Sequence, residues 1–228
     1  MRAPLSVIIP TLNAGPGLAL AIAALGEGLE AGLIRELIIS DGGSEDETCA
    51  IAEEAGARLV RGVPGRGGQL ARGAAEAKGD WLLFLHGDTL LSENWTSGVQ
   101  EHIKLGSTGP AGYFQLAFQA AGFAPRFVAG WANLRSRLLS LPYGDQGLLI
   151  SRALFDSVGG YQDIPLMEDV ALARALRGKL RALPATAYTS AARYEKAGWI
   201  KRGSRNLWTL TRYFAGASPE ALARSYRR

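Results

Sequence analysis

His86 and Asp88 stand two residues apart, directly after an apolar run from Trp81 to Leu85. Five consecutive large apolar residues predict a central strand that is buried on both faces. Ligands of open α/β sheets bind beyond the carboxyl ends of the strands, so this strand would deliver Asp88 to a binding site. A carboxylate suits Mg²⁺, and a carboxylate with an imidazole suits Mn²⁺, which makes both side chains candidate metal ligands. The alternatives are a turn cap for Asp88 and a histidine at the edge of the core for His86.

Two adjacent carboxylates, Glu168 and Asp169, follow Pro165 and precede a helical pattern. Neighbouring positions on a helix point in different directions, so one carboxylate can act on a substrate while the other anchors locally. A carboxylate beside a hydroxyl can serve as its general base. Helix starts are also rich in acids because of the helix dipole, which leaves simple capping as the alternative.

Two glycine-containing loops follow strand patterns, Asp41-Gly42-Gly43 and Gly65-Arg66-Gly67-Gly68. An Asp before two glycines can hydrogen-bond a base or a ribose while the backbone approaches the ligand closely. Backbone amides at a helix start, with Arg66 beside them, can bind a phosphate group. A plain tight turn and a flexible surface loop are the respective alternatives.

Short apolar runs alternate with helical patterns in the first half of the chain, which predicts right-handed crossovers and a mostly parallel sheet. The spacing of Ser44 and Glu47 matches a capping box and predicts that a helix follows Ser44. The expected strands cover residues 5–9, 36–39, 58–61 and 81–85, and the expected helices cover 18–29, a segment after Ser44, and 69–77.

The second half has a different pattern. Residues 113–120 alternate between apolar and polar, which predicts a half-exposed strand. Ser218-Pro219 is a favourable start for a last helix. Further expected elements are helices over 94–105, 126–139, 152–158 and from about 168, a turn over 142–147 and a strand over 148–150.

The composition is that of one large globular α/β domain. Of the 228 residues, 47% are hydrophobic and 20% are charged, which suits a sizeable core and argues against disorder. No apolar run reaches the roughly 20 residues that a membrane helix needs, and neither a span nor a signal peptide is expected. Cys49 is the only cysteine, which excludes an internal disulfide and fits a reducing compartment, so the expected location is the cytoplasm.

Taken in order, these motifs resemble the family 2 glycosyltransferases, an inverting group with a GT-A fold that uses nucleotide-activated sugars. The resemblance implies one domain over 1–228, with a nucleotide-sugar half over 1–110 and an acceptor half over 111–228. The implied fold is α/β, with a Rossmann-like, mostly parallel central sheet flanked by helices and a helical C-terminal region on the acceptor side. The matching motifs are Ser6 to Asn13, Asp41 to Ser44, Gly65 to Gly67, His86 to Asp88, Gly144 to Gln146 and Glu168-Asp169.

The resemblance also implies roles for the matching residues. Asp169 would be the catalytic base of a single displacement, and Asp88, with His86, would hold a divalent metal, Mn²⁺ or Mg²⁺. The donor would be a nucleoside diphosphate sugar, with UDP favoured over GDP. The residues expected to bind it are Pro10, Thr11, Asn13, Asp41, Arg66, Gly87, Asp88, Asp145, Gln146 and Glu168. The short HGDT, GDQG and IPLMED motifs resemble the subgroup associated with radical-SAM and selenium proteins.

Three positions depart from the usual pattern of the family. Ala14 stands where an acid is common, and Ala71 stands where an Asn is common. His86 replaces the first acid of the DxD motif, which leaves one carboxylate for the metal. Metal affinity is therefore the part of the resemblance that most needs a test.

Basic residues crowd the last quarter of a chain whose formal net charge is +4, and aromatic residues lie among them. Such clustering indicates a polyanionic neighbour, and an aromatic and basic helix is compatible with an interface. We expect the region from Arg193 to Tyr226 to form the acceptor side, to contact a lipid-linked acceptor and to touch the inner face of a membrane peripherally. A solvated basic face over packed aromatics is the alternative, and no nucleic acid partner is expected.

Three other classes compete with this interpretation. Gly15-Pro16-Gly17 supplies two of the three glycines of a dinucleotide fingerprint, as in an NAD-binding oxidoreductase. A sugar nucleotidyltransferase needs a basic residue in the first loop, and none lies between Thr11 and Gly26. A nucleotide-binding scaffold without catalysis is the third alternative, because the metal motif carries a single carboxylate.

Overall fold

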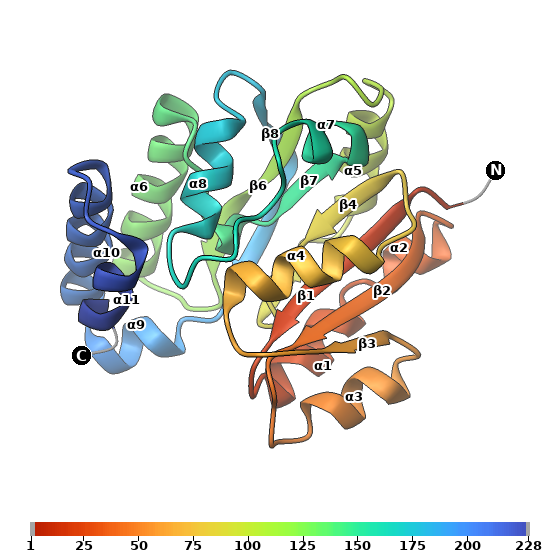
Figure 1. The fold of residues 1–228 in the computed structure, drawn as a ribbon, viewed down its shortest axis with the longest axis horizontal. Coiled ribbons are helices and arrows are strands. Elements are labelled where there is room, and N and C mark those ends of the chain that lie inside the picture. The colour runs from red at the N-terminus through yellow and green to blue at the C-terminus, as the bar shows by residue number, and fades with distance from the viewer. Residues whose placement is uncertain (1–2, 227–228) are drawn as a thin grey trace.

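The computed structural model describes residues 3–226 and shows a single eight-stranded sheet with helices on both faces (Figure 1). The strands lie in the order β3-β2-β1-β4-β7-β6-β8-β5. Strand β4 of the first half pairs with β7 of the second, so both halves share one sheet. The strands are β1 (Leu5–Thr11), β2 (Ile34–Asp41), β3 (Arg58–Arg61), β4 (Trp81–Phe84), β5 (Thr89–Leu91), β6 (Ala111–Phe118), β7 (Leu148–Ser151) and β8 (Leu180–Thr189).

The first four strands form the expected parallel unit. Strand β1 pairs in parallel with β2 and β4, and β2 pairs in parallel with β3. Strand β7 enters antiparallel to β4 and β6, while β6 and β8 are parallel to each other. The helices are α1 (Gly15–Ala23), α2 (Gly26–Glu30), α3 (Thr48–Glu54), α4 (Arg66–Glu76), α5 (Trp95–Ile103), α6 (Phe123–Leu139), a 3₁₀ turn (Gly144–Gln146), α7 (Arg152–Ser157), α8 (Glu168–Ala175), α9 (Ala192–Ala197), α10 (Trp199–Phe214) and α11 (Pro219–Tyr226).

The core lies on both faces of the sheet because side chains of a strand alternate between faces. Val7 and Ile9 of β1 pack with Trp95 of α5 in one cluster. Ile8 faces the opposite side and packs with Leu70 of α4 and other residues in a second cluster. This two-sided burial explains why β1 and β4 are almost continuously apolar.

Two local predictions differ from the structure, and strands β5 and β8 are absent from the predicted elements. The predicted helix over 18–29 is divided into α1 and α2, and the predicted capping box does not form because Ser44 Oγ donates to Asp41 Oδ1 at 2.5 Å. Helix α3 begins instead at Thr48, whose Oγ1 accepts from the backbone N–H of Gly15. Strand β8 was not predicted, although its inward residues Leu183, Ala185, Ala187 and Thr189 alternate strictly; Pro184 obscured the pattern.

Helices α6, α9, α10 and α11 gather at one end of the sheet, beyond β6 and β8 (Figure 1). Helix α6 packs on β6 through small residues, and α10 contacts α6, α9 and α11. Among residues 3–226, no helix combines the length and apolar character that crossing a bilayer requires. The C-terminal helices lie on one side of the sheet edge at which β1 and β4 end.

Candidate active site

The carboxyl ends of β1 and β4 open onto a cavity of about 610 Å³. This is the edge where ligands bind in open α/β sheets, because strand order reverses there. The structure brings seven of the predicted site residues to the wall of this cavity: Pro10, Thr11, Asn13, Arg66, His86, Gly87 and Asp88. We call it the donor cavity, after the sequence-based expectation that these residues bind a sugar donor.

Asp41 does not line the donor cavity. It is buried, and its two carboxylate oxygens accept hydrogen bonds from Thr11 Oγ1 at 3.0 Å and from the backbone N–H groups of Gly43 and Ser44 at 2.8 Å each. These bonds and that of the Ser44 hydroxyl lower the pKa of Asp41, although burial opposes them. The carboxylate thus shapes the loop beside β1, and direct contact with a nucleoside stays a prediction.

The glycine-arginine loop is held by a residue that the sequence analysis missed, Gln69. Its side-chain amide donates to the carbonyls of Thr11 at 2.6 Å and Ser40 at 2.9 Å, and its oxygen accepts from Gly65 N–H at 3.2 Å. A Cβ at Gly67 would lie 2.2 Å from the carbonyl oxygen of Gln162, so only glycine fits there. The loop before α8 therefore covers the start of α4, and Gly65 and the side chain of Arg66 are the parts of this motif that line the cavity.

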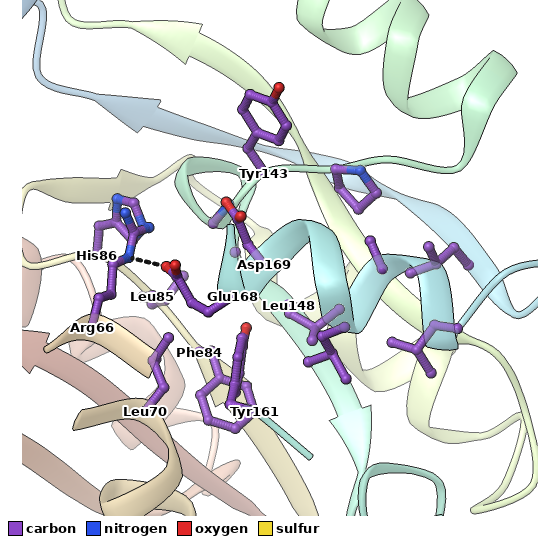
Figure 2. A pocket seen from close by; sticks show the side chains of 17 residues that line it. Arg66, Leu70, Phe84, Leu85, His86, Tyr143, Leu148, Tyr161, Glu168 and Asp169 are labelled. Carbon is purple, nitrogen blue, oxygen red and sulfur yellow. Dashed lines mark hydrogen bonds and ion pairs between the residues drawn. The ribbon is translucent and has the colours of Figure 1, made fainter. Parts of the chain in front are cut away.

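The adjacent acids of α8 diverge as the helix geometry predicts (Figure 2). Glu168 points to Arg66, with 3.0 Å between Oε1 and Nε, as an ion pair rather than a well-aligned hydrogen bond. Asp169 points toward Tyr143 and the 3₁₀ turn; its Oδ2 accepts from Gly144 N–H at 2.9 Å. One acid anchors the arginine, and the carboxylate of the other is held by the 3₁₀ turn and lines a second cavity.

Burial governs the charges of the side chains around Arg66. Glu168 is 2% exposed, and burial raises its pKa while the Arg66 guanidinium opposes the rise. Desolvation lowers the pKa of His86 well below its usual value of 6.5, and the charges of Arg66 and Arg193 act in the same direction. The imidazole of His86 is therefore neutral at pH 7 and can accept or coordinate through a ring nitrogen.

A second cavity, of about 260 Å³, lies between the side chains around Arg66 and the C-terminal helices, and we call it the acceptor cavity. Asp88, Asp145 and Asp169 reach it from one side. Residues of β8, α9 and α10 reach it from the other, and Arg193 lines both cavities. Arg193, Tyr194, Arg202, Asn206, Thr209 and Tyr226 lie in the region that the sequence predicts for the acceptor side, whereas the sequence did not predict Phe118, Tyr143, Leu166, Met167, Thr189 and Ser190. The alternating pattern of β8 is the signal in the sequence that predicts Thr189 and Ser190 at the end of a strand.

Gln146 lies outside both cavities. It is fully buried, and its side-chain oxygen accepts from Ser136 Oγ at 2.6 Å while its amide donates to the carbonyl of Phe114 at 3.1 Å. The amide therefore joins α6 and β6 to the 3₁₀ turn. The structure places Gln146 as a support for the turn that carries Asp145, and direct contact of Gln146 with a ligand stays a prediction.

Asp145 provides a stability prediction because its Oδ1 is buried with no hydrogen-bond partner among the described residues. Burial raises its pKa from 3.8 to about 6, against the attraction of Arg135. A carboxyl whose pKa is higher in the folded state destabilises the fold once ionised, so stability falls as pH rises from about 4 through 6. We expect Asp145→Asn to raise the melting temperature by about 5 °C at pH 8 and to leave it unchanged at pH 4, checked by calorimetry.

A metal would have few protein ligands here. Residues 3–226 contain no group of three or more His, Cys, Asp or Glu side chains arranged to hold an ion. The donor set nevertheless fits a shared cation, because Asp88 lines the donor cavity and the Nε2 of neutral His86 is buried without a hydrogen-bond partner among the described residues. Such a cation would take its remaining ligands from the substrate and water, as Mg²⁺ and Mn²⁺ do.

The fold is shared with solved glycosyltransferases of the GT-A class. Glucosyl-3-phosphoglycerate synthase of Mycobacterium tuberculosis, solved with Mn²⁺, UDP and phosphoglyceric acid, superposes with a TM-score of 0.57 at 23% identity, over 78% of this chain and 67% of that one. TarS of S. aureus superposes with a TM-score of 0.63 at 16% identity, over 82% of this chain and 37% of that one. The chain thus spans little more than a third of TarS.

The family follows from the sequence match. Residues 6–127, which are 122 of the 228, match the model described as Glycosyl transferase family 2, and the chain belongs to this family. A search of curated proteins returned no match. Membership of this family makes the protein a nucleotide-sugar glycosyltransferase by class and decides against the oxidoreductase and the nucleotidyltransferase.

Proposed function

We propose that this protein transfers a sugar from a UDP-sugar to an acceptor hydroxyl in one inverting displacement, with Asp169 as the general base. The observation that carries the proposal is the position of Asp169. Its carboxylate lines the acceptor cavity, next to the junction at which Arg66, His86 and Asp88 line both cavities. A base at that point can reach a hydroxyl on one side while the leaving group departs on the other.

The base is oriented by two backbone amides. Gly144 N–H donates to Oδ2 at 2.9 Å, and the N–H of Val170 donates to Oδ1 at 2.7 Å. Each carboxylate oxygen has a further lone pair, so the group can still accept the proton of an attacking hydroxyl. Fixing the carboxylate before the substrate arrives removes part of the entropic cost of the displacement.

Cations on the donor side stabilise the departing diphosphate. Arg66 and Arg193 both line the donor cavity, and an arginine can bind phosphate oxygens through two parallel hydrogen bonds. Asp88 and His86 would hold a divalent cation, which when bound neutralises charge on the leaving diphosphate. With a single carboxylate in the motif, we propose a cation that binds together with the nucleotide.

The choice of UDP is supported by the fold neighbours, because glucosyl-3-phosphoglycerate synthase has been solved with UDP and with UDP-glucose. The acceptor is a hydroxyl compound that fits between Asp169 and the C-terminal helices, and a lipid-linked compound is the form that we propose. The HGDT, GDQG and IPLMED motifs support a place in the radical-SAM and selenium-associated subgroup.

A thermal-shift panel tests donor and metal together. We expect UDP and UDP-sugars to raise the melting temperature in the presence of Mn²⁺, because a ligand that binds only the native state stabilises it by mass action. Mn²⁺ alone should produce no shift, since two protein ligands hold it weakly, and His86→Asp should strengthen the joint effect by about tenfold in apparent affinity. GDP, dTDP and CMP sugars are the controls; a larger shift with one of these would overturn the choice of UDP, and NADH binding without nucleotide-sugar binding would overturn the class.

A further inference from the structure

Helix α6 is turned with its large apolar side chains toward solvent. The residues that it buries against the sheet are small, namely Ala129, Ala132 and Ser136. Its outer stripe follows the spacing i, i+4, i+7 and i+11 expected for one face of a helix. The stripe consists of Phe127, Trp131, Leu134 and Leu138, which are 65%, 52%, 47% and 71% exposed.

Helix α10 buries Leu210 but also leaves large apolar residues exposed. Thr209 is buried, and Asn206 is half-buried and donates through its side-chain amide to the hydroxyl of Tyr194 at 3.0 Å. The outer face carries four large apolar residues. They are Ile200, Leu207, Trp208 and Phe214, which are 85%, 48%, 64% and 49% exposed. A globular helix normally buries such residues, so an unpartnered apolar face on two helices indicates a binding surface.

The two faces belong to one surface. Helices α6 and α10 are in contact and lie beside each other at the end of the sheet (Figure 1). Trp131 of α6 and Leu207 of α10 line the same groove, a cavity of about 50 Å³ between the helices. The stripes therefore meet along this groove, and we call the combined area the α6/α10 face.

The positive charge of these two helices indicates that the partner is anionic. Together, α6 and α10 carry seven basic residues and no Asp or Glu. Arg126, Arg137 and Lys201 are exposed, and none of them forms an ion pair with a residue in the described part of the chain. Apolar and aromatic side chains flanked by basic residues are the combination that binds an anionic bilayer at its interface.

We propose that the α6/α10 face docks on the surface of an anionic lipid bilayer. A second copy of the chain is disfavoured because a two-fold interface would bring the two sets of unbalanced bases together. Nucleic acid would neutralise the basic residues but would leave aliphatic side chains such as Leu138 and Ile200 without a partner. The helices lie on the bilayer and do not cross it, in keeping with the finding on helix length above.

The same surface leads to the acceptor cavity. The groove between α6 and α10 is lined at its inner end by Tyr143, Asp145, Tyr194 and Asn206, and these four residues also line the acceptor cavity beside Asp169. Docking of the α6/α10 face would thus place the acceptor cavity next to the lipid surface. This consequence rests on the proposed function, whereas the docking itself does not.

Vesicle flotation without donor or acceptor tests the docking independently of any transfer activity. We expect the protein to float with vesicles of phosphatidylcholine containing about 30% phosphatidylglycerol and not with pure phosphatidylcholine. Phe127→Ser/Trp208→Ser should reduce binding at least about tenfold, and Arg126→Glu/Arg137→Glu should reduce it in a salt-dependent manner. All four positions are exposed, so unchanged melting temperatures confirm that the variants fold.

Matched controls lie elsewhere on the surface. Leu20→Ser/Leu29→Ser removes two leucines that are 59% and 61% exposed, and Arg35→Glu/Arg177→Glu reverses two exposed arginines; both should bind like wild type. The proposal is overturned if the wild type does not float, if it floats equally with neutral vesicles, or if Phe127→Ser/Trp208→Ser binds undiminished. Sedimentation of a dimer that this variant dissociates would assign the face to a second copy instead.

Discussion

Asp169→Asn is expected to lower the turnover number for sugar transfer by about 10³-fold while leaving UDP binding within a factor of about two. General bases contribute roughly 10² to 10⁴ to rate, and an amide cannot take the proton of the attacking hydroxyl. The substitution keeps the shape of the side chain but leaves one oxygen acceptor, so one of the two N–H groups of Gly144 and Val170 keeps its partner and the other loses it. The measurement is release of UDP from the donor sugar, with water as acceptor where no other is available, alongside calorimetric titration with UDP.

The control for this variant is Asp163→Asn, an exposed acid in the loop that precedes α8. Its rate should equal that of wild type, because its loss of charge does not alter the group that faces the acceptor cavity. If Asp169→Asn keeps its rate within about threefold, Asp169 is not the base. Asp145 would then be the carboxylate to examine, because it also lines the acceptor cavity.

Arg66→Met is expected to reduce both stability and donor affinity. It leaves the Glu168 carboxylate buried without its counter-charge, and breaking a buried pair from one side costs about 3–5 kcal/mol. The Arg66 side chain is 37% exposed, so solvent screens the pair and we expect about 2 kcal/mol at pH 8. UDP affinity should fall about tenfold, because Arg66 also lines the donor cavity.

The stability loss should depend on pH with a definite sign. Without Arg66, the pKa of Glu168 rises further above its ordinary 4.5, because burial is no longer opposed by the guanidinium. Ionising a carboxyl whose folded pKa is raised destabilises the fold in wild type and variant alike, so the deficit of the variant is absent below both folded pKa values and grows as pH rises from the pKa of Glu168 in the wild type to its higher pKa in the variant. Urea unfolding at pH 5 and pH 8 measures it.

The double variant Arg66→Met/Glu168→Gln separates the pair from simple loss of packing. It removes the unpaired charge, so most of the stability at pH 8 should return while UDP binding stays weak. A double variant as unstable as Arg66→Met would show that the side-chain stem of Arg66, rather than its charge, supports the start of α4 and α8.

Many of the strands and helices could be predicted because they depend on the pattern of apolar and polar residues within a short segment. The apolar runs at Leu5 and Trp81 predict strands buried on both faces, and the sheet contains them as β1 and β4. The family resemblance likewise rested on local motifs, and the match over residues 6–127 confirms it. The helix start near Ser44 was predicted wrongly because Ser44 bonds the nearby Asp41, and because Thr48, where α3 begins, bonds Gly15, which is distant in the sequence.

The sequence by itself determined which chemical groups stand at the ends of strands and at the starts of helices, because periodicity and loop position are local properties of the chain. It therefore identified Asp88, Arg66 and the Glu168-Asp169 pair as candidates. Only the tertiary structure decided which of the two acids pairs with Arg66 and which faces the acceptor cavity, because the direction of a side chain depends on what packs against its helix. The same reason applies to α6: its apolar residues are plain in the sequence, but the packing of its small residues on the sheet turns the apolar face outward.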